Sequence, residues 1–196
     1  NRSGRTKPMT KKLNQLKILE QLLELAKREG ADNADAVLFN ATSIEVAQRL
    51  GKPEKLERSE TADLGLRVFV GKSQAIVSST DFSENALKET VERSMAMARA
   101  APEDPWCGIA EPNQIFTDLV DLDIHDPIEP STETLIEKVR EAEDAGRGVL
   151  GVTNSEGAEA GWSNAQVALA TSNGFAQDYS LSSHSISVSV LAGKGT

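Results

Sequence analysis

The side chains best suited by type to nucleophilic or metal chemistry are Cys107, His125 and His184. A hydrolytic zinc site needs imidazoles or carboxylates around one ion, usually with two ligands on one face of a helix. His125 lies among prolines and His184 in a strand-like segment, and neither belongs to a His-Glu-x-x-His or His-Glu-x-x-x-His array. The sequence therefore predicts no metal ligand and no catalytic residue in this chain.

Cys107 leaves one alternative open. A cysteine nucleophile needs a base that takes its proton, and folding could bring His184 to the thiol although no histidine is near it in sequence. We keep a thiol hydrolase as an alternative to a structural role for Cys107. Because Cys107 is the one cysteine of the sequence, an internal disulfide is excluded.

Two further patterns fall short of known sites. The acidic run 141–144 lies on a predicted helix and lacks the spaced oxygens of a calcium loop, so we expect a solvated helix face. The run 193–196, Gly-Lys-Gly-Thr, lacks the glycine spacing of a phosphate-binding loop.

Composition restricts the partners. The 196 residues carry a net charge of −9 and a charged fraction of 26%. Because nucleic-acid binding relies on Lys and Arg displacing counterions, this balance argues against direct contact with DNA or RNA. No apolar run approaches the ~18 residues that cross a bilayer. The basic start, 1–8, leads into no apolar signal core, and we expect a cytoplasmic protein.

The first half of the chain predicts a helix followed by strands. Apolar residues at three- and four-residue spacing predict a helix over 11–29 that ends at Gly30; they are Leu13, Leu16, Leu19, Leu22, Leu23 and Ala26. Segment 36–39 is typical of a buried strand and 44–49 of a half-exposed one, whereas polar 51–59 suggests a loop or fraying strand ends. The clearest hairpin joins 64–70 to 75–78 through Gly71 and Lys72.

Two more helices are expected. The first runs over 83–101 with Asp81 or Ser83 as its N-cap. Proline-rich 102–130 then predicts a linker or long loop. The second helix runs over 131–145 and stops at Gly146, with three residues facing inward: Leu135, Ile136 and Val139.

The last third is rich in strand patterns. Segments 148–152 and 165–171 resemble strands, and 175–179 returns antiparallel after a turn at 172–174. In 182–190, Ile and Val alternate with Ser, which predicts one buried and one hydroxyl-lined face. The hydroxyl face could line a cavity and receive an extended peptide by strand addition, or it could simply face solvent.

These elements predict an α+β fold in which antiparallel sheets pack with about three helices. The predicted organisation is a basic tail (1–12), an N-terminal α+β domain (13–101), a proline-rich linker (102–130) and the start of a second, strand-rich region (131–196).

Segment 170–175, then Tyr179 and 185–193, resembles the middle of the PmbA/TldE proteins of the TldD/PmbA family, once called modulators of DNA gyrase. Further matches occur upstream in the same order, at 34–36, 63–68, 78–81 and 98–104. The resemblance therefore extends from about residue 13 to the end of the sequence.

The resemblance implies a cytoplasmic, zinc-dependent TldD–TldE protease that processes peptides and loosely folded proteins. The zinc is expected in a TldD-like partner subunit, within a His-Glu-x-x-x-His helix that lies beyond the matching region. This chain would be an amino-terminal portion that contributes the substrate cavity and subunit contact, paired with that partner or in a homo-oligomer. The alternative is a non-enzymatic module that acts on DNA gyrase. Residues of the resembling segment are our candidates for cavity lining: Ser172, Asn173, Gly174, Phe175, Tyr179 and His184.

Overall fold

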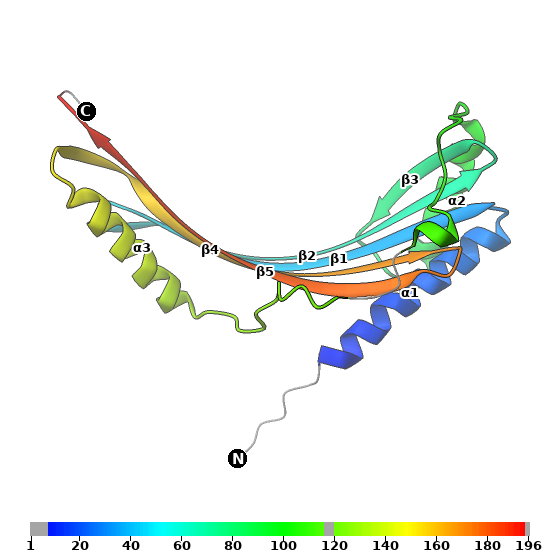
Figure 1. Ribbon diagram of the computed structural model, residues 1–196, viewed down its shortest axis with the longest axis horizontal. Helices are drawn as coiled ribbons and strands as arrows, with labels where there is room; N and C mark the ends of the chain where they lie inside the picture. The colour runs from blue at the N-terminus through cyan, green and yellow to red at the C-terminus, as the bar shows by residue number, and fades with distance from the viewer. Residues whose placement is uncertain (1–7, 116–119, 195–196) are drawn as a thin grey trace, which may run out of the picture. The chain divides into compact units, whose positions relative to one another are not determined.

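The computed structural model describes residues 8–115 and 120–194, with side chains from residue 15 onward. Along the chain the elements are α1 (Pro8–Arg28), β1 (Asn33–Arg49), β2 (Lys52–Val70), β3 (Ser73–Ser79), α2 (Glu84–Ala100), the 3-10 turn η1 (Pro112–Gln114), α3 (Thr132–Arg147), β4 (Val152–Thr171) and β5 (Ala176–Ala192) (Figure 1). The strands form one sheet in the order β3-β2-β1-β4-β5. The predicted α+β class is confirmed. None of the described helices is long and apolar enough to cross a membrane.

The chain divides into two compact units that alternate along the sequence. Unit 1 comprises 1–40, 62–122 and 166–179, and unit 2 comprises 41–61, 123–165 and 180–196. Four of the five boundaries fall inside the long strands β1, β2, β4 and β5, so each of these strands contributes one part to each unit; the fifth, between 122 and 123, lies in the segment before α3.

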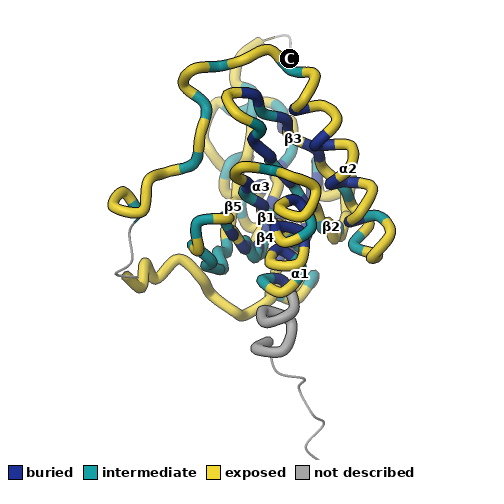
Figure 2. Tube along the Cα trace, turned by 90° about the vertical axis from the view of Figure 1, so that its right-hand side faces the viewer, coloured by how far each residue is buried: buried dark blue, intermediate teal, exposed yellow. Residues whose placement is uncertain are grey.

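The core of unit 1 forms between the helices α1 and α2 and the sheet. Leu19 and Leu22 of α1 are fully buried, as the leucine spacing predicted, whereas Leu13 lies outside the described side chains. Val91 and Met95 of α2 join the same cluster. Figure 2 shows buried stretches in dark blue and exposed stretches in yellow along both helices.

The hairpin and the helix cap predicted in unit 1 are confirmed. The β2–β3 hairpin pairs Leu64 with Ser79 and Val70 with Ser73 around the predicted Gly71–Lys72 turn. Ser83 caps α2, and its side chain accepts a hydrogen bond from the Ala86 backbone N–H.

Several strand predictions need correction. Segment 36–39 is not buried throughout, because Val37 and Phe39 are 38% and 39% exposed on one face of β1. Segment 51–59, expected to be a loop or fraying strand ends, lies almost wholly in β2, where exposed charged residues are compatible with an extended strand. The predicted strand 148–152 is largely a turn, and β4 begins only at Val152.

The core of unit 2 forms where α3 packs on the sheet. Leu135 and Val139 are buried against residues of β1 and β4, namely Ile44, Val46, Ala158, Ala160 and Trp162. Ile136 was predicted to face inward but is 43% exposed.

Gly146 lies inside α3 and does not end it, contrary to the prediction; the helix continues to Arg147 and is capped by Gly148. A Cβ atom at Gly146 would lie 3.0 Å from Val190 Cγ1 and 3.1 Å from Val188 Cγ2. The glycine therefore permits close packing of the helix on β5, which outweighs its low helix propensity.

Glu143 of α3 is fully buried and accepts four hydrogen bonds. The donors are Gln48 Nε2 at 3.0 Å, the Leu50 backbone N at 2.6 Å, the Gly51 backbone N at 3.0 Å and Ser155 Oγ at 2.7 Å. This carboxylate therefore joins α3 to the β1–β2 turn and to β4. The acidic run 141–144 is thus not entirely a solvated face, as was expected, because Glu143 points into the core.

The pKa of Glu143 results from two opposing effects. Burial alone would raise it, but the four hydrogen bonds, with that of Gln48 the strongest, favour the charged form and lower the pKa from 4.5 to about 2. Glu143 is therefore a buried carboxylate that stays ionised.

The turn that Glu143 holds has an unusual backbone. Leu50 and Gly51 have φ of +51° and +74°, which is the two-residue hairpin turn with both central residues left-handed. Asn-Gly is the preferred pair there, whereas a leucine in this region is strained. The hydrogen bonds from both turn N–H groups to Glu143 help to hold this conformation.

A glycine in β4 brings Ser155 to the same carboxylate. Ser155 and Ala158 both face α3, although residues three apart in a regular strand lie on opposite faces. Gly157, between them, has φ +110°, and a Cβ there would lie 2.8 Å from the Gln48 carbonyl oxygen. A bulge at this glycine resets the alternation of the strand.

We predict that Glu143→Gln lowers the free energy of unfolding by about 2–4 kcal/mol, because an amide leaves at least one buried donor unpaired. Urea unfolding at neutral pH measures the change, with exposed Glu141→Gln as the matched control.

Since the pKa of Glu143 is lowered from 4.5 to about 2, its stabilisation is complete above pH 4.5 and is lost as the pH falls toward 2. The difference in the free energy of unfolding between the wild type and Glu143→Gln should therefore decrease as the pH falls over that range. Equal losses of stability in Glu143→Gln and Glu141→Gln, or a stability difference that does not depend on pH, would contradict the assignment of Glu143 as a stabilising buried carboxylate.

We predict that Leu50→Asn raises the free energy of unfolding by about 1 kcal/mol, because asparagine tolerates the left-handed conformation better than leucine. The measurement is the same urea titration. Leu56→Asn, at an exposed site of β2, serves as control and should give no gain. A loss of stability in Leu50→Asn would show that the leucine side chain matters more than its backbone conformation.

Candidate functional site

The turn between β4 and β5 holds the first of the predicted cavity residues. The Ser172 N–H donates to the Ala34 carbonyl at 2.8 Å, and the Ala34 N–H donates to Ser172 Oγ at 3.0 Å. These two bonds fix the turn against the start of β1. Gly174 has φ +97°, a conformation that favours glycine.

Asn173 connects this turn to the proline-rich segment. Its Nδ2 donates to the Ala110 carbonyl at 2.8 Å. The Asp104 N–H donates to the Lys72 carbonyl at 2.7 Å and attaches the same segment to the β2–β3 turn. Segment 105–114 is thereby attached to the rest of unit 1 just before its first residue and again at Ala110.

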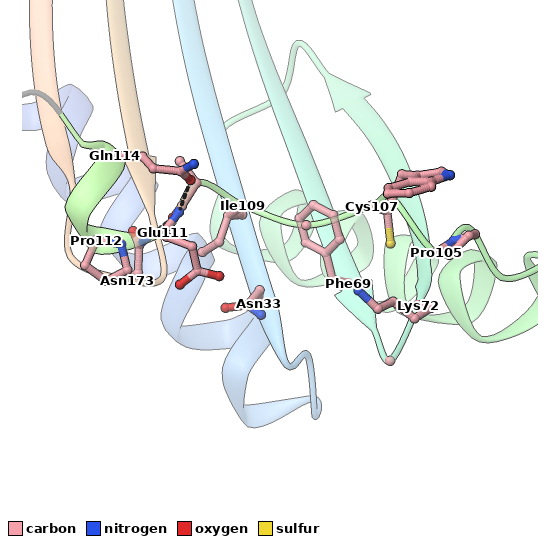
Figure 3. A pocket seen from close by; sticks show the side chains of 14 residues that line it. Asn33, Phe69, Lys72, Pro105, Cys107, Ile109, Glu111, Pro112, Gln114 and Asn173 are labelled. Carbon is pink, nitrogen blue, oxygen red and sulfur yellow. Dashed lines mark hydrogen bonds between the residues drawn. The ribbon is translucent and has the colours of Figure 1, made fainter.

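A pocket of about 690 Å³ lies under this segment, entirely within unit 1. Figure 3 shows Phe69, Lys72 and Cys107 toward one end and Asn33, Glu111 and Asn173 toward the other. The lining comes from the start of β1, the β2–β3 turn, the β4–β5 turn and the following residues of the segment: Pro105, Trp106, Cys107, Gly108, Ile109, Ala110, Glu111, Pro112 and Gln114.

A second hollow of about 330 Å³ shares Pro112 and Asn173 with the first. Gly174 and Phe175 also line it. Asn173, Gly174 and Phe175 thus line a hollow, and Ser172 fixes the turn that carries them.

The other two predicted residues lie elsewhere. Tyr179 is 52% exposed on β5 and lines neither of these two hollows. His184 is exposed and belongs to unit 2.

The chemistry of the larger pocket is that of amides and aromatic rings. Asn33, Gln114 and Asn173 supply side-chain amides, and Gln114 Oε1 accepts from the Glu111 N–H at 2.9 Å (Figure 3). Among the described residues that line it, Lys72 and Glu111 carry formal charges, which have opposite signs. Such a lining suits neutral groups that form hydrogen bonds, such as peptide amides.

An ion pair contacts Phe69, one of the residues that line this pocket. The Arg67 guanidinium lies 5.1 Å from the centroid of the Phe69 ring and donates to the Asp35 carboxylate, with Nε 2.9 Å from Oδ2. Phe69 is only 2% exposed and contributes to the lining of the pocket. Sequence reasoning missed Asn33 and Phe69, because only the folded sheet brings them near segment 105–114.

Cys107, His125 and His184 were the residues singled out for nucleophilic or metal chemistry. Cys107 lines the larger pocket, but no histidine is among the described residues that line it. His125 Nε2 lies 2.8 Å from Asn164 Nδ2. Within 8–115 and 120–194, no three His, Cys, Asp or Glu side chains are grouped so that they could hold a metal ion. The described residues therefore do not fit the donor set of a zinc site.

Comparison with known proteins identifies the family. Residues 34–98 match PmbA/TldA metallopeptidase domain 1, and residues 125–196 match the PmbA/TldA metallopeptidase central domain. Metalloprotease PmbA of Escherichia coli O157:H7 is 33% identical over 183 residues, which is 91% of this chain and 40% of that protein.

Solved structures share the fold. A candidate modulator of DNA gyrase from Bacteroides thetaiotaomicron has a TM-score of 0.82 at 18% identity, over 91% of this chain and 41% of its own. TldE from Thermococcus kodakarensis has a TM-score of 0.73 at 16% identity, over 91% of this chain and 40% of its own. The chain thus spans about two fifths of the length of the relatives it matches. It belongs to the PmbA/TldD metallopeptidase family, of which it carries the first and central domains.

Proposed function

We propose that this chain is the amino-terminal part of a PmbA/TldE-like subunit of a zinc-dependent TldD–TldE protease that acts on peptides and loosely folded proteins. Its role is to receive substrate and contact the partner, while the zinc ion and the hydrolytic step belong to a TldD-like subunit. When bound there, the ion supplies an activated water for attack on a peptide carbonyl.

The observation that carries this proposal is a metallopeptidase family match in a chain whose described residues present a pocket but no metal-ligand group. The amide groups of Asn33, Gln114 and Asn173 can exchange hydrogen bonds with any peptide backbone. Recognition of the backbone in place of side chains would suit a protease of broad sequence tolerance.

The pocket wall depends on Asn173, because its amide holds segment 105–114 through Ala110. We predict that Asn173→Ala, tested in the full-length subunit together with its partner, raises KM for a model peptide several-fold and changes kcat little. Asn85→Ala, at an exposed position of α2, is the matched control. An unchanged KM in Asn173→Ala would show that this pocket does not take part in substrate binding.

The proposal that the partner subunit carries the zinc ion gives a second prediction. The purified chain alone should show no chelator-sensitive cleavage of casein or of an unstructured peptide. Chelator-sensitive cleavage should appear when the metal-bearing partner is added to the full-length subunit. Cleavage by the chain alone that is lost with chelator would contradict the proposal. Cleavage that is indifferent to chelator but lost in Cys107→Ser would favour the thiol alternative.

An action on DNA gyrase is the second candidate, suggested by the description of the Bacteroides relative. The net charge of −9 disfavours direct DNA contact, so such an effect would act through the gyrase protein or through proteolysis. Co-purification of gyrase with the chain, independent of metal and of the partner subunit, would support this candidate.

A further inference from the structure

The two charged residues of the larger pocket lie toward its opposite ends. Figure 3 shows Lys72 toward the end that holds Phe69, and Glu111 toward the end that holds Asn33. The described lining therefore presents a positive charge at one end and a negative charge at the other. A ligand that matches both is itself zwitterionic, with its two charges separated along its length.

Hydrogen bonds fix the main chain at both charged residues. The Lys72 carbonyl accepts from the Asp104 N–H at 2.7 Å. The Glu111 N–H donates to Gln114 Oε1 at 2.9 Å, and the Glu111 carbonyl accepts from the Gln114 N–H at 2.8 Å. The two charged side chains therefore extend from positions of the pocket wall that the fold sets.

Neither charge is taken up by an ion pair with another described residue. Elsewhere on the surface, Lys55, Arg58 and Lys88 each pair with glutamate. A charged group that lines a pocket and has no counter-charge beside it is available to a ligand group of the opposite sign. Lys72 is therefore suited to a carboxylate, and Glu111 to an ammonium group.

The rest of the lining suits the body of a short peptide. Asn33 and Gln114 supply amides for the peptide groups, and Phe69 and Trp106 supply rings against which an apolar side chain packs. Trp106 is 92% exposed, so its ring has surface to offer a ligand. The volume of about 690 Å³ lies within the range of about 300–1,000 Å³ that is usual for pockets that enclose small ligands.

We propose that this pocket binds short peptides whose two termini are both free, with the terminal carboxylate at Lys72 and the terminal ammonium group at Glu111. Phe69 lies toward the Lys72 end, so an apolar residue is favoured at the carboxyl terminus of the peptide (Figure 3). This proposal deepens the proposed function, on which the role of the peptide as substrate or product rests, because it names the substrate class. The binding itself requires neither zinc nor the partner subunit.

Calorimetric titration of the full-length subunit, in the presence of chelator, tests the binding with the tripeptide Ala-Ala-Leu. Its N-acetyl and C-amide derivatives each lack one terminal charge and should bind about threefold more weakly than the free peptide. Lys72→Gln should weaken binding of the free peptide by a similar factor but leave binding of the C-amide unchanged. Glu111→Gln should show the same pattern with the N-acetyl derivative, because each substitution removes the partner of one terminus.

Lys17→Gln and Glu89→Gln are the matched controls, since both residues are exposed on helices and line neither hollow. They change the net charge by the same amounts and should leave all three dissociation constants unchanged. Equal affinity for the free and blocked peptides, or equal losses in the control variants, would overturn this proposal while leaving recognition of the peptide backbone in place. Failure of every form of the peptide to bind would overturn both this proposal and the proposed role of the pocket in receiving substrate.

Discussion

The structure of unit 2 depends on one ionised carboxylate that has no cation beside it among its described partners. Glu143 is buried, and its charge is stabilised by hydrogen bonds from Gln48, the β1–β2 turn and Ser155. A charge in this position is costly unless every lone pair finds a donor, which is why the surrounding backbone adopts unusual conformations. The left-handed Leu50 and the bulge at Gly157 both deliver donors to it. Such a carboxylate, saturated by N–H and O–H groups, has no lone pair left for a metal ion.

Much of the fold could be predicted from local patterns. The leucine spacing of α1, the Ser83 cap and the Gly71–Lys72 turn depend on residues close in sequence, and the structure confirms them. The long strands were harder, because β2 starts as an edge whose exposed charges resemble a loop.

Other features depend on contacts between distant residues. Burial of Glu143 requires Gln48 and Ser155, and nothing in the acidic run itself distinguishes Glu143 from exposed Glu141. Gly146 resembled a helix stop, but its role is to admit Val188 and Val190 of β5. The expected buried face of 182–190 is also wrong for the described chain, because Ile186 and Val188 lie exposed at the sheet edge.

In the candidate site, too, some residues could be found from the sequence and others only from contacts between distant parts of the chain. The resemblance selected Asn173, Gly174 and Phe175, which do line hollows, but Asn33 and Phe69 required the sheet to be assembled first. The proposed function assigns substrate binding to the polar side chains of this chain and the metal chemistry to residues outside those described. A zinc titration of the purified chain against a chromogenic chelator tests that claim most directly. The chelator should keep the zinc; one zinc ion held tightly per chain, and released on substitution of His125 or His184, would contradict the proposed function.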